Sequence, residues 1–236
     1  MDSGTTYGLV GRGRVAAHLT RYLELESQPC VSWHRGMREP AEEVLAGCDV
    51  VLLAISDGAL PTILDAHPDF AGRPLVHFSG SLAVEGLHGA HPLMTFGPEL
   101  YDLETYRSIP FITERGGARF EDLFPGLVNP SWEIDRELKP LYHALCVLAG
   151  NCTTLLWAKA VGDFESRLGL PGEALRPYLE RTYRNVAASG GAALTGPLAR
   201  REHETIARDL AALAGDPFGP VYRAFVEVFE REEVRA

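Results

Sequence analysis

Short apolar runs alternate with helical patterns over the first half of the chain. Residues 7–10 and 49–55 are apolar runs of strand length, and residues 15–25 repeat apolar positions at helical spacing. A run that is apolar throughout is typical of a parallel strand buried on both faces. The alternation predicts an α/β fold, with a doubly wound parallel sheet and crossover helices.

The same alternation extends to about residue 134. Further strands are expected at residues 29–33, 74–78, 109–113 and 131–134, and further helices at residues 41–46, 59–66 and 118–124. After Asp135 the pattern is helical alone, with a long apolar stretch over residues 138–168 and three later segments. We therefore predict an α/β domain over residues 1–136 and a smaller all-helical domain over residues 137–236.

The first predicted strand leads into a glycine-containing turn of the form G-x-G-x-x-A, the dinucleotide-binding fingerprint. Gly11 permits the tight turn, Gly13 lets the backbone approach a pyrophosphate, and Ala16 lets the helix lie close to the sheet. The N–H groups at the start of that helix would hold the phosphates. The motif predicts a Rossmann-type domain with cofactor contacts from Gly11, Arg12, Gly13, Arg14, Val15 and Ala16.

The end of the second predicted strand indicates which dinucleotide is bound. In NAD-specific folds an acidic residue there binds the ribose hydroxyls, whereas arginine accommodates the extra phosphate of NADP. This chain has no acid at that point, and Ser32, His34 and Arg35 suit a 2′-phosphate. We expect NADP(H) as the cofactor.

Two more loops follow the carboxyl ends of predicted parallel strands, where α/β folds bind ligands. The first contains Ala54, Ser56 and Asp57, and the second contains Ser79 and Gly80. Because these strands belong to one parallel sheet, we expect both loops to contact the same cofactor.

Composition narrows the class of protein further. A formal net charge of -10 argues against a nucleic-acid surface, which needs a basic stripe, but it leaves room for a phosphate-bearing cofactor. The four cysteines form no C-x-x-C pair and no metal-like set with histidine, so we expect reduced thiols and no metal. We also expect that no apolar stretch is long enough to cross a bilayer and that the protein is cytoplasmic.

Three residues are candidates for the chemistry. His91 is held in an extended segment by Pro92, and histidine is the side chain best matched to proton transfer near neutral pH. Lys159 lies in the long apolar stretch, where burial beside the nicotinamide would lower its pKa; alternatively, it is a surface lysine paired with Asp163 or Glu165. Asn151 could orient a substrate or cap a buried backbone group.

Several short motifs follow one another over the second half of the chain: Tyr142-His143-Ala144, Gly150-Asn151, Asn185, Ala-Leu-Thr-Gly-Pro-Leu-Ala-Arg at residues 193–200, and Val221-Tyr222-Arg223. Their order resembles a bacterial family in which a Rossmann-like domain precedes a helical domain of unknown function, number 2520. The resemblance covers nearly the whole chain, and the motif at residues 193–200 is its most specific part.

The wider superfamily implied is that of ketopantoate reductase, pyrroline-carboxylate reductase, hydroxyisobutyrate dehydrogenase, prephenate dehydrogenase and 6-phosphogluconate dehydrogenase. Its members pair a nucleotide-binding domain with an all-helical domain that commonly makes the dimer, and the active site lies in the cleft between them. The segment His91–Pro98 is similar to the histidine-proline segment of prephenate dehydrogenases, where the histidine meets the substrate hydroxyl. Lys159 and Asp163 resemble the lysine and asparagine pair of ketopantoate reductases, in which the lysine is the acid.

The resemblance implies an NADP(H)-dependent oxidoreductase that transfers a hydride between nicotinamide and a small carbonyl, imine or hydroxy compound, one that carries a carboxylate. Lys159 or His91 would supply the proton, and Asn151 would orient the substrate oxygen. We also expect a homodimer, because the helical domain has too few residues to bury its apolar content alone. The alternatives are a non-catalytic NADP(H)-binding sensor or assembly protein, and a purely structural scaffold that binds no dinucleotide.

Overall fold

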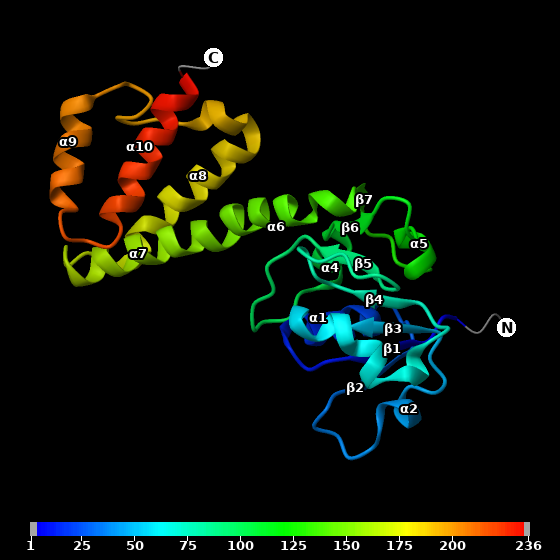
Figure 1. Ribbon diagram of the computed structural model, residues 1–236. Helices are drawn as coiled ribbons and strands as arrows, with labels where there is room; N and C mark the ends of the chain where they lie inside the picture. Colours follow the sequence, from blue (N-terminus) through cyan, green and yellow to red (C-terminus); the bar gives the residue numbers. More distant parts are fainter. Residues whose placement is uncertain (1–3, 234–236) are drawn as a thin grey trace. The chain divides into compact units, whose positions relative to one another are not determined.

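The computed structural model describes residues 4–233, and contacts within it divide the chain into two compact units, residues 1–155 and 156–236. The first unit contains a seven-stranded sheet with the order β2-β1-β3-β4-β5-β6-β7 (Figure 1). The strands are β1 Tyr7–Val10, β2 Cys30–Trp33, β3 Val50–Leu53, β4 Leu75–His77, β5 His88–Pro92, β6 Phe111–Glu114 and β7 Ser131–Ile134.

Neighbouring strands of this sheet are parallel, with one exception. β5 and β6 pair antiparallel, with Ala90 opposite Thr113 and His91 opposite Ile112. The strand β5 was not among the predicted strands, because its sequence is rich in histidine, glycine and proline rather than β-branched residues. The predicted α/β fold with a doubly wound sheet is confirmed, and the antiparallel pair is the feature that the sequence did not indicate.

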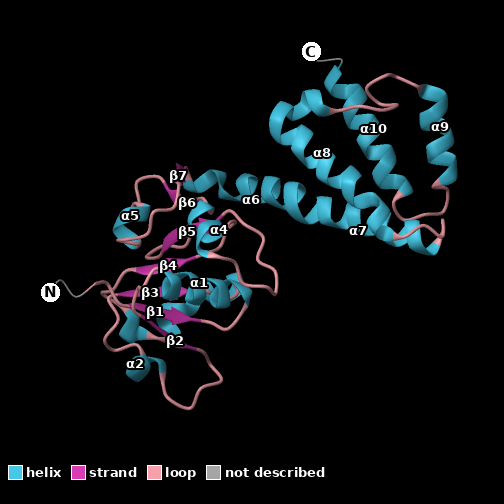
Figure 2. Ribbon diagram, turned by 180° about the vertical axis from the view of Figure 1, so that it is seen from behind, coloured by secondary structure: helices cyan, strands magenta, loops and turns pink. Residues whose placement is uncertain are grey.

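Helices cover both faces of the sheet (Figure 2). The first unit has the helices α1 Arg14–Leu25, α2 Ala41–Val44, α3 Ile63–Ala66, α4 Leu103–Ser108 and α5 Phe120–Leu123, with 3-10 turns η1 Asp57–Thr62 and η2 Pro68–Phe70. Successive residues of a strand point to opposite faces, so Leu9 and Leu52 pack beneath α1 while Val51 and Leu53 pack beneath α2 and η1. Burial on both faces explains why β1 and β3 are apolar throughout.

A continuous helical run follows β7. It comprises the turn η3 Arg136–Leu138, the helix α6 Lys139–Val147, a π-helical segment η4 Leu148–Cys152 and the helix α7 Thr153–Ser166. The predicted domain boundary after residue 136 marks the change from strands to helices, but the contacts divide the chain later, within this run. The two divisions differ because α6 packs against the sheet of the first unit through Lys139, Tyr142 and His143.

The run Arg136–Ser166 is the one helix among residues 4–233 that is, by length and composition alone, long and apolar enough to cross a membrane. None of its most apolar window is buried within the structure. This finding corrects the expectation that no apolar stretch reaches that length. The run also carries Lys159 and Asp163, ionisable side chains whose insertion in lipid is costly.

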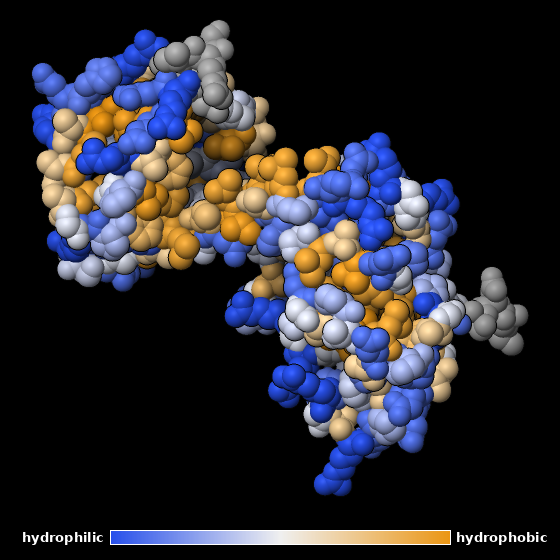
Figure 3. Space-filling view, viewed as in Figure 1, coloured by the Kyte–Doolittle hydropathy of each residue, from blue (hydrophilic) through white to orange (hydrophobic). Residues whose placement is uncertain are grey.

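The second unit is helical throughout its described part, as predicted for the carboxyl-terminal region. After α7 it contains η5 Gly172–Leu175, α8 Arg176–Ser189, η6 Gly190–Ala193, α9 His203–Ala212 and α10 Gly219–Glu233. Its most buried apolar side chains include Leu175, Ile206 and Val226, whereas Tyr178 and Tyr183 of α8 are about two-thirds exposed. Much of the apolar surface of this unit is therefore left uncovered, and Figure 3 also shows apolar side chains gathered over the helical run.

Candidate functional site

The turn after β1 can be formed only by glycine at its first position. Gly11 has a φ of +138°, and a Cβ atom there would lie 2.2 Å from the carbonyl oxygen of Ala54. The Gly11 N–H donates to the carbonyl of Trp33, and the Ala54 N–H donates to the carbonyl of Val10. The turn thus ties together the carboxyl ends of β1, β2 and β3, which leaves no room for a side chain.

The second glycine of the fingerprint has a different surrounding. Gly13 is the N-cap residue of α1, with an ordinary extended backbone, and a Cβ atom there would meet nothing within 4 Å among the described residues. Ala16 is buried against the sheet in the next turn of the helix. No side chain caps the first N–H groups of α1 in the described structure, so they are available to an anion. These features fit the pyrophosphate of a dinucleotide.

The loops after β3 and β4 are joined through one carboxylate. The Ser79 hydroxyl donates to Oδ2 of Asp57 at 2.9 Å, and the Ser81 hydroxyl donates to the same oxygen at 3.1 Å. The backbone N–H groups of Ser81 and Leu82 donate to Oγ of Ser79. The structure therefore brings together the two loops that the sequence assigned to one cofactor, and Asp57 holds them against each other.

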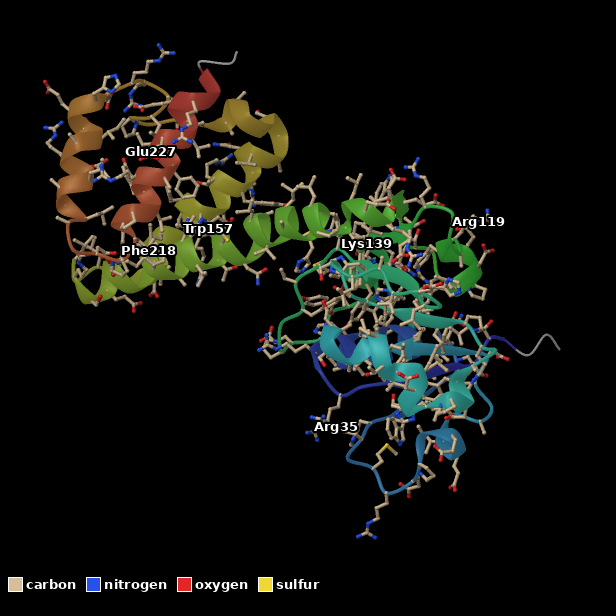
Figure 4. All side chains as sticks on the ribbon, in the orientation of Figure 1. Arg35, Arg119, Lys139, Trp157, Phe218 and Glu227 are labelled. Atoms are coloured by element: carbon tan, nitrogen blue, oxygen red, sulfur yellow. The ribbon has the colours of Figure 1, made fainter. Side chains whose placement is uncertain are left out.

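The loop after β2 carries the residues assigned to the 2′-phosphate. The Gly36 N–H donates to Nδ1 of His34, and Nη1 of Arg12 lies 3.8 Å from the position of a Cβ atom at Gly36. Ser32 and Arg35 are exposed, and the Arg35 side chain extends from this loop in Figure 4. Arg12 of the glycine turn thus lies beside the loop that follows β2, where it adds positive charge.

His91 of β5 meets the long helical run. Its Nδ1 lies 2.7 Å from the hydroxyl oxygen of Tyr142, and the two rings are edge-on with centroids 5.5 Å apart. A Cβ atom at Gly80 would lie 3.0 Å from Nε2 of His91 and 2.8 Å from Cδ2 of His143. The absence of a side chain at Gly80 therefore lets the rings of His91 and His143 pack directly against its backbone.

The protonation states of this pair follow from burial. The pKa of His91 is lowered to about 4, chiefly by burial and then by the charges of His143 and Lys139, while Asp57 acts in the opposite direction. Burial raises the pKa of Tyr142 well above its ordinary value. At neutral pH His91 is therefore neutral and Tyr142 keeps its proton, so the tyrosine hydroxyl can donate to Nδ1 and leave the ring hydrogen on Nε2.

The segment that follows His91 is anchored to α1. Nε2 of His18 is 3.0 Å from the Gly97 carbonyl, its Nδ1 is 2.9 Å from the hydroxyl of Tyr106, and the Tyr101 hydroxyl donates to the Thr95 carbonyl. The sequence assigned His18 no role. Its buried ring links the helix that begins at the glycine turn to the segment that carries His91.

Asn151 lies in the π-helical segment of the first unit, on the exposed surface. Its side chain has no hydrogen-bond partner among the described residues. A Cβ atom at the preceding Gly150 would be in ordinary contact with Thr95, at 3.7 Å. The segment thus lies beside the His91–Pro98 loop at Gly150, next to Asn151 in the chain, and π-helical segments recur at functional sites.

Lys159 has a different environment from the one expected. In the second unit its Nζ donates to Asp163 at 2.5 Å and to Asp216 at 2.8 Å, and Arg167 pairs with both carboxylates. The hydrogen bonds that Lys159 donates to these two aspartates raise its pKa. The expected lowering of that pKa by burial is wrong, and the pairing with Asp163 that was considered as the alternative is observed.

Three side chains to which the sequence analysis assigned no role in the chemistry lie on one face of α6. Tyr142 and His143 follow Lys139 by three and four positions, which is the spacing of side chains on one helix face. Lys139 is only 2% exposed, and burial lowers its pKa. The sequence signal that could have identified these residues is the spacing of three polar side chains in an apolar helix.

One group of side chains could hold a metal by distance alone. Ligand atoms of Glu42, His67 and Asp69 lie within 4.8 Å of one another. Both carboxylates are exposed, Asp69 pairs with Arg73, and the His67 ring stacks on Phe70. We assign no metal to this group. All four cysteines are free thiols in the structure.

Comparisons with known proteins agree with this architecture. Residues 113–228 match the family described as Domain of unknown function (DUF2520), which confirms the predicted resemblance for this part of the chain. No curated protein matches the chain. A Bacteroides fragilis protein assigned as an NADP oxidoreductase has a similar structure, with 22% identity, 97% of this chain and 99% of that chain covered, and a TM-score of 0.77.

Two further solved structures are similar at lower identity. A Plasmodium falciparum pyrroline carboxylate reductase with NADP bound is 13% identical over 98% of this chain and 97% of its own, with a TM-score of 0.59. A Streptomyces aurantiacus imine reductase is 16% identical over 96% of this chain and 94% of its own, with a TM-score of 0.64. These likenesses establish a Rossmann-like α/β fold with a helical carboxyl-terminal region.

Proposed function

We propose that this chain is an NADP(H)-dependent oxidoreductase that transfers a hydride between nicotinamide and a small carbonyl, imine or hydroxy compound bearing a carboxylate. The topology of the sheet carries the proposal. Strands β1, β3, β4 and β5 are adjacent and parallel. They deliver Gly11, Ala54, Ser79 and His91 to the carboxyl edge of the sheet, where α/β folds bind dinucleotides.

The preference for NADP(H) rests on the loop after β2. Arg12, His34 and Arg35 offer positive and hydrogen-bonding groups there, and no carboxylate stands in the position that binds the ribose hydroxyls of NAD. The Plasmodium enzyme of similar fold was solved with NADP bound. The place of this chain among ketopantoate-reductase-like enzymes is part of the same proposal.

The residues of the site divide the chemistry between them. When bound, NADPH supplies a hydride to the carbon of a C=O or C=N bond and leaves as NADP⁺. The oxygen or nitrogen of that bond takes up one proton, and we assign its delivery to Nε2 of His91. As Nε2 releases this proton, Nδ1 takes the hydroxyl proton of Tyr142, and water returns a proton to the tyrosine oxygen, so the ring stays neutral throughout. A neutral imidazole can polarise the bond as a hydrogen-bond donor, and Asn151 can hold the substrate beside it.

His91 is better placed than Lys159 to pass on a proton, because of the partners that each side chain has. Lys159 donates to two carboxylates that raise its pKa, which makes loss of a proton at neutral pH costly. The ring of His91 has one nitrogen bonded to Tyr142, and its other nitrogen, beside Gly80, makes no hydrogen bond to the described residues. The proposal therefore places Lys159 outside the proton transfer.

A cofactor titration tests the proposal. Purified protein is titrated with NADPH and with NADH while nicotinamide fluorescence is followed, and then ketopantoate, other 2-oxo acids and cyclic imines are added. We expect tighter binding of NADPH, its oxidation by one of these compounds, and a loss of turnover of about 100-fold or more in His91→Asn with binding retained. Binding of NADPH without turnover would favour the alternative of a non-catalytic NADP(H)-binding sensor. Absence of NADPH binding would overturn the proposal.

We also propose that the protein acts as a cytoplasmic homodimer. Leu141, Leu145, Leu148 and Leu155 form a stripe along the helical run, and each is more than half exposed. Burying such an exposed apolar stripe against another apolar surface is favourable, and a second copy of the chain supplies an equally apolar surface. Sedimentation at micromolar concentration should give a dimer. A monomer that floats with lipid vesicles would show that a membrane covers the stripe instead.

A further inference from the structure

The buried lysine of this chain is Lys139, not the residue that the sequence favoured. It stands at the start of α6 and is 2% exposed (Figure 4). Its Nζ donates to Oε1 of Glu114, a residue of β6 that is itself 7% exposed, at 2.9 Å. Burying two charges is costly, and a pair is retained only where its geometry is well satisfied. A contribution to stability alone therefore does not account for this pair.

The pair lies directly over β5. A Cβ atom at Gly89 would lie 2.5 Å from Oε1 of Glu114 and 2.6 Å from Nζ of Lys139, so only glycine leaves room for the ion pair. Gly89 precedes His91 by two residues, which places both on the same face of the strand. On α6, Tyr142 follows Lys139 by three residues. The strand and the helix thus meet twice, once at the ion pair and once at His91.

Other charged and titratable groups lie around the pair. Nε of Arg136 is 3.0 Å from Oε2 of Glu114, and Nε2 of His77 is 3.9 Å from Oε1. That Nε2 is buried and has no hydrogen-bond partner among the described residues. The groups that act on His91 are His143 and Lys139 from α6 and Asp57 from the loop after β3. Of these three, Lys139 is the one that forms the ion pair with Glu114.

We propose that the Lys139–Glu114 ion pair positions His91. The pair holds α6 in register on β5, so that Tyr142 meets the imidazole, and it sets the charge state of that ring. Its part in turnover rests on the proposed function, whereas its effect on His91 does not. Near the ring, the Lys139 cation opposes the uptake of a proton, and Glu114 offsets part of that charge. Because the two partners carry opposite charges, removing Glu114 as well should undo part of the effect of removing Lys139.

The opposite signs give a test that needs no activity. The imidazole signals of the full chain are titrated by NMR, and the His91 signal is assigned by its loss in His91→Asn. In Lys139→Met we expect the pKa of His91 to rise by about one unit from its wild-type value, because a nearby cation is gone and Glu114 remains. In the double variant Lys139→Met with Glu114→Gln we expect at least half of that rise to be reversed.

A merely structural pair would behave differently. Loosened packing would let water reach His91, so its pKa would move toward the ordinary value in both variants and at least as far in the double variant. That result, or an unchanged pKa in Lys139→Met, overturns the proposal. If Lys139→Met does not fold, the single variant Glu114→Gln tests the proposal instead. A His91 pKa above that of the wild type contradicts the proposal, and a pKa equal to or below that of the wild type supports it.

Two further measurements separate this proposal from the proposed function. Arg119→Gln removes an exposed arginine paired with Asp122 in the same unit and should leave the pKa of His91 unchanged. If NADPH is oxidised, the inflection of the pH-rate profile should move with the pKa of His91 in each variant, while the affinity for NADPH stays as in the wild type. If the wild type oxidises no NADPH, the proposed function fails and the NMR result still stands.

Discussion

Nδ1 of His91 lies 2.7 Å from the hydroxyl oxygen of Tyr142, although the two residues are 51 positions apart in the chain. One stands on the strand β5 and the other on the helix α6, so the hydrogen bond joins the sheet to the helical run. It occupies one ring nitrogen and leaves Nε2, which packs beside Gly80, without a hydrogen bond to the described residues. The orientation of the proposed proton carrier therefore depends on a residue of another element.

Tyr142→Phe should lower kcat by about tenfold and leave the affinity for NADPH unchanged, because one orienting hydrogen bond worth roughly 1 kcal/mol is lost. The pH-rate profile should change as well, since the ring of His91 no longer has a fixed tautomer. Tyr178→Phe is the matched control, because Tyr178 of α8 is 70% exposed. Steady-state kinetics over a range of pH values check this, and equal kcat values for Tyr142→Phe and the wild type contradict it.

The two glycines of the turn after β1 should respond differently to alanine. Gly13→Ala should fold like the wild type and lose at least about tenfold in NADPH affinity, since its Cβ atom meets no protein atom but would enter the space of the pyrophosphate. Gly11→Ala should lose about 3 kcal/mol or more of stability, from its positive φ and the contact with Ala54. Thermal unfolding and fluorescence titration separate the two effects. Unchanged NADPH binding by folded Gly13→Ala would remove the pyrophosphate from this turn.

Gly80→Ala should abolish turnover while NADPH still binds. The added Cβ atom would lie 3.0 Å from Nε2 of His91 and 2.8 Å from the ring of His143, so it would push both rings out of place and misdirect the proton that Nε2 carries. Gly47→Ala is the control, because a Cβ atom there meets nothing within 4 Å. Turnover of Gly80→Ala at the wild-type rate would place the reaction elsewhere.

The protein should lose stability as the pH falls from about 6.5 toward 4. Burial lowers the pKa of both His77 and His91 to about 4, below the ordinary value of 6.5, so over this interval the unfolded chain binds protons that the folded chain does not. Stability is complete above pH 6.5, and each histidine removes on the order of 2 kcal/mol at pH 5. Urea unfolding at pH 7 and pH 5 measures this.

His91→Asn provides the control for this pH dependence and should remove about half of it. His203→Asn changes an exposed histidine of α9 and should leave the pH dependence as in the wild type. Equal free energies of unfolding at pH 7 and pH 5 for the wild type would show that neither buried histidine excludes protons.

Lys159→Met should lower the melting temperature modestly and leave the rate of NADPH oxidation unchanged. The substitution leaves Asp163 and Asp216 with Arg167 as their remaining partner, and their mutual repulsion is then less compensated. Loss of turnover with full NADPH binding would instead restore the lysine to the mechanism. The conservative variant Lys159→Arg should keep most of the stability, because it keeps the charge.

The sequence by itself determined the class of fold and the place of the glycine turn. Those features are local: a continuous apolar run reports burial on both faces, helical spacing reports one buried face, and the fingerprint lies within a single strand-to-helix turn. It also indicated the two loops after β3 and β4, because the carboxyl ends of parallel strands must meet. The hydrogen bonds that join these loops through Asp57 follow from that meeting.

Only the tertiary structure decided which polar side chains of the long helical run face the site. Lys139 and Lys159 both interrupt an apolar helix, and their local patterns do not tell them apart. The partner of Lys139 is Glu114, on the strand that pairs antiparallel with β5, whereas the partners of Lys159 are Asp163 and Asp216 in the second unit. The pKa of a lysine depends on its burial and on its charged neighbours, and both are set by contacts between segments distant in the chain. For that reason the sequence indicated a lysine of interest, and the fold decided which one is buried.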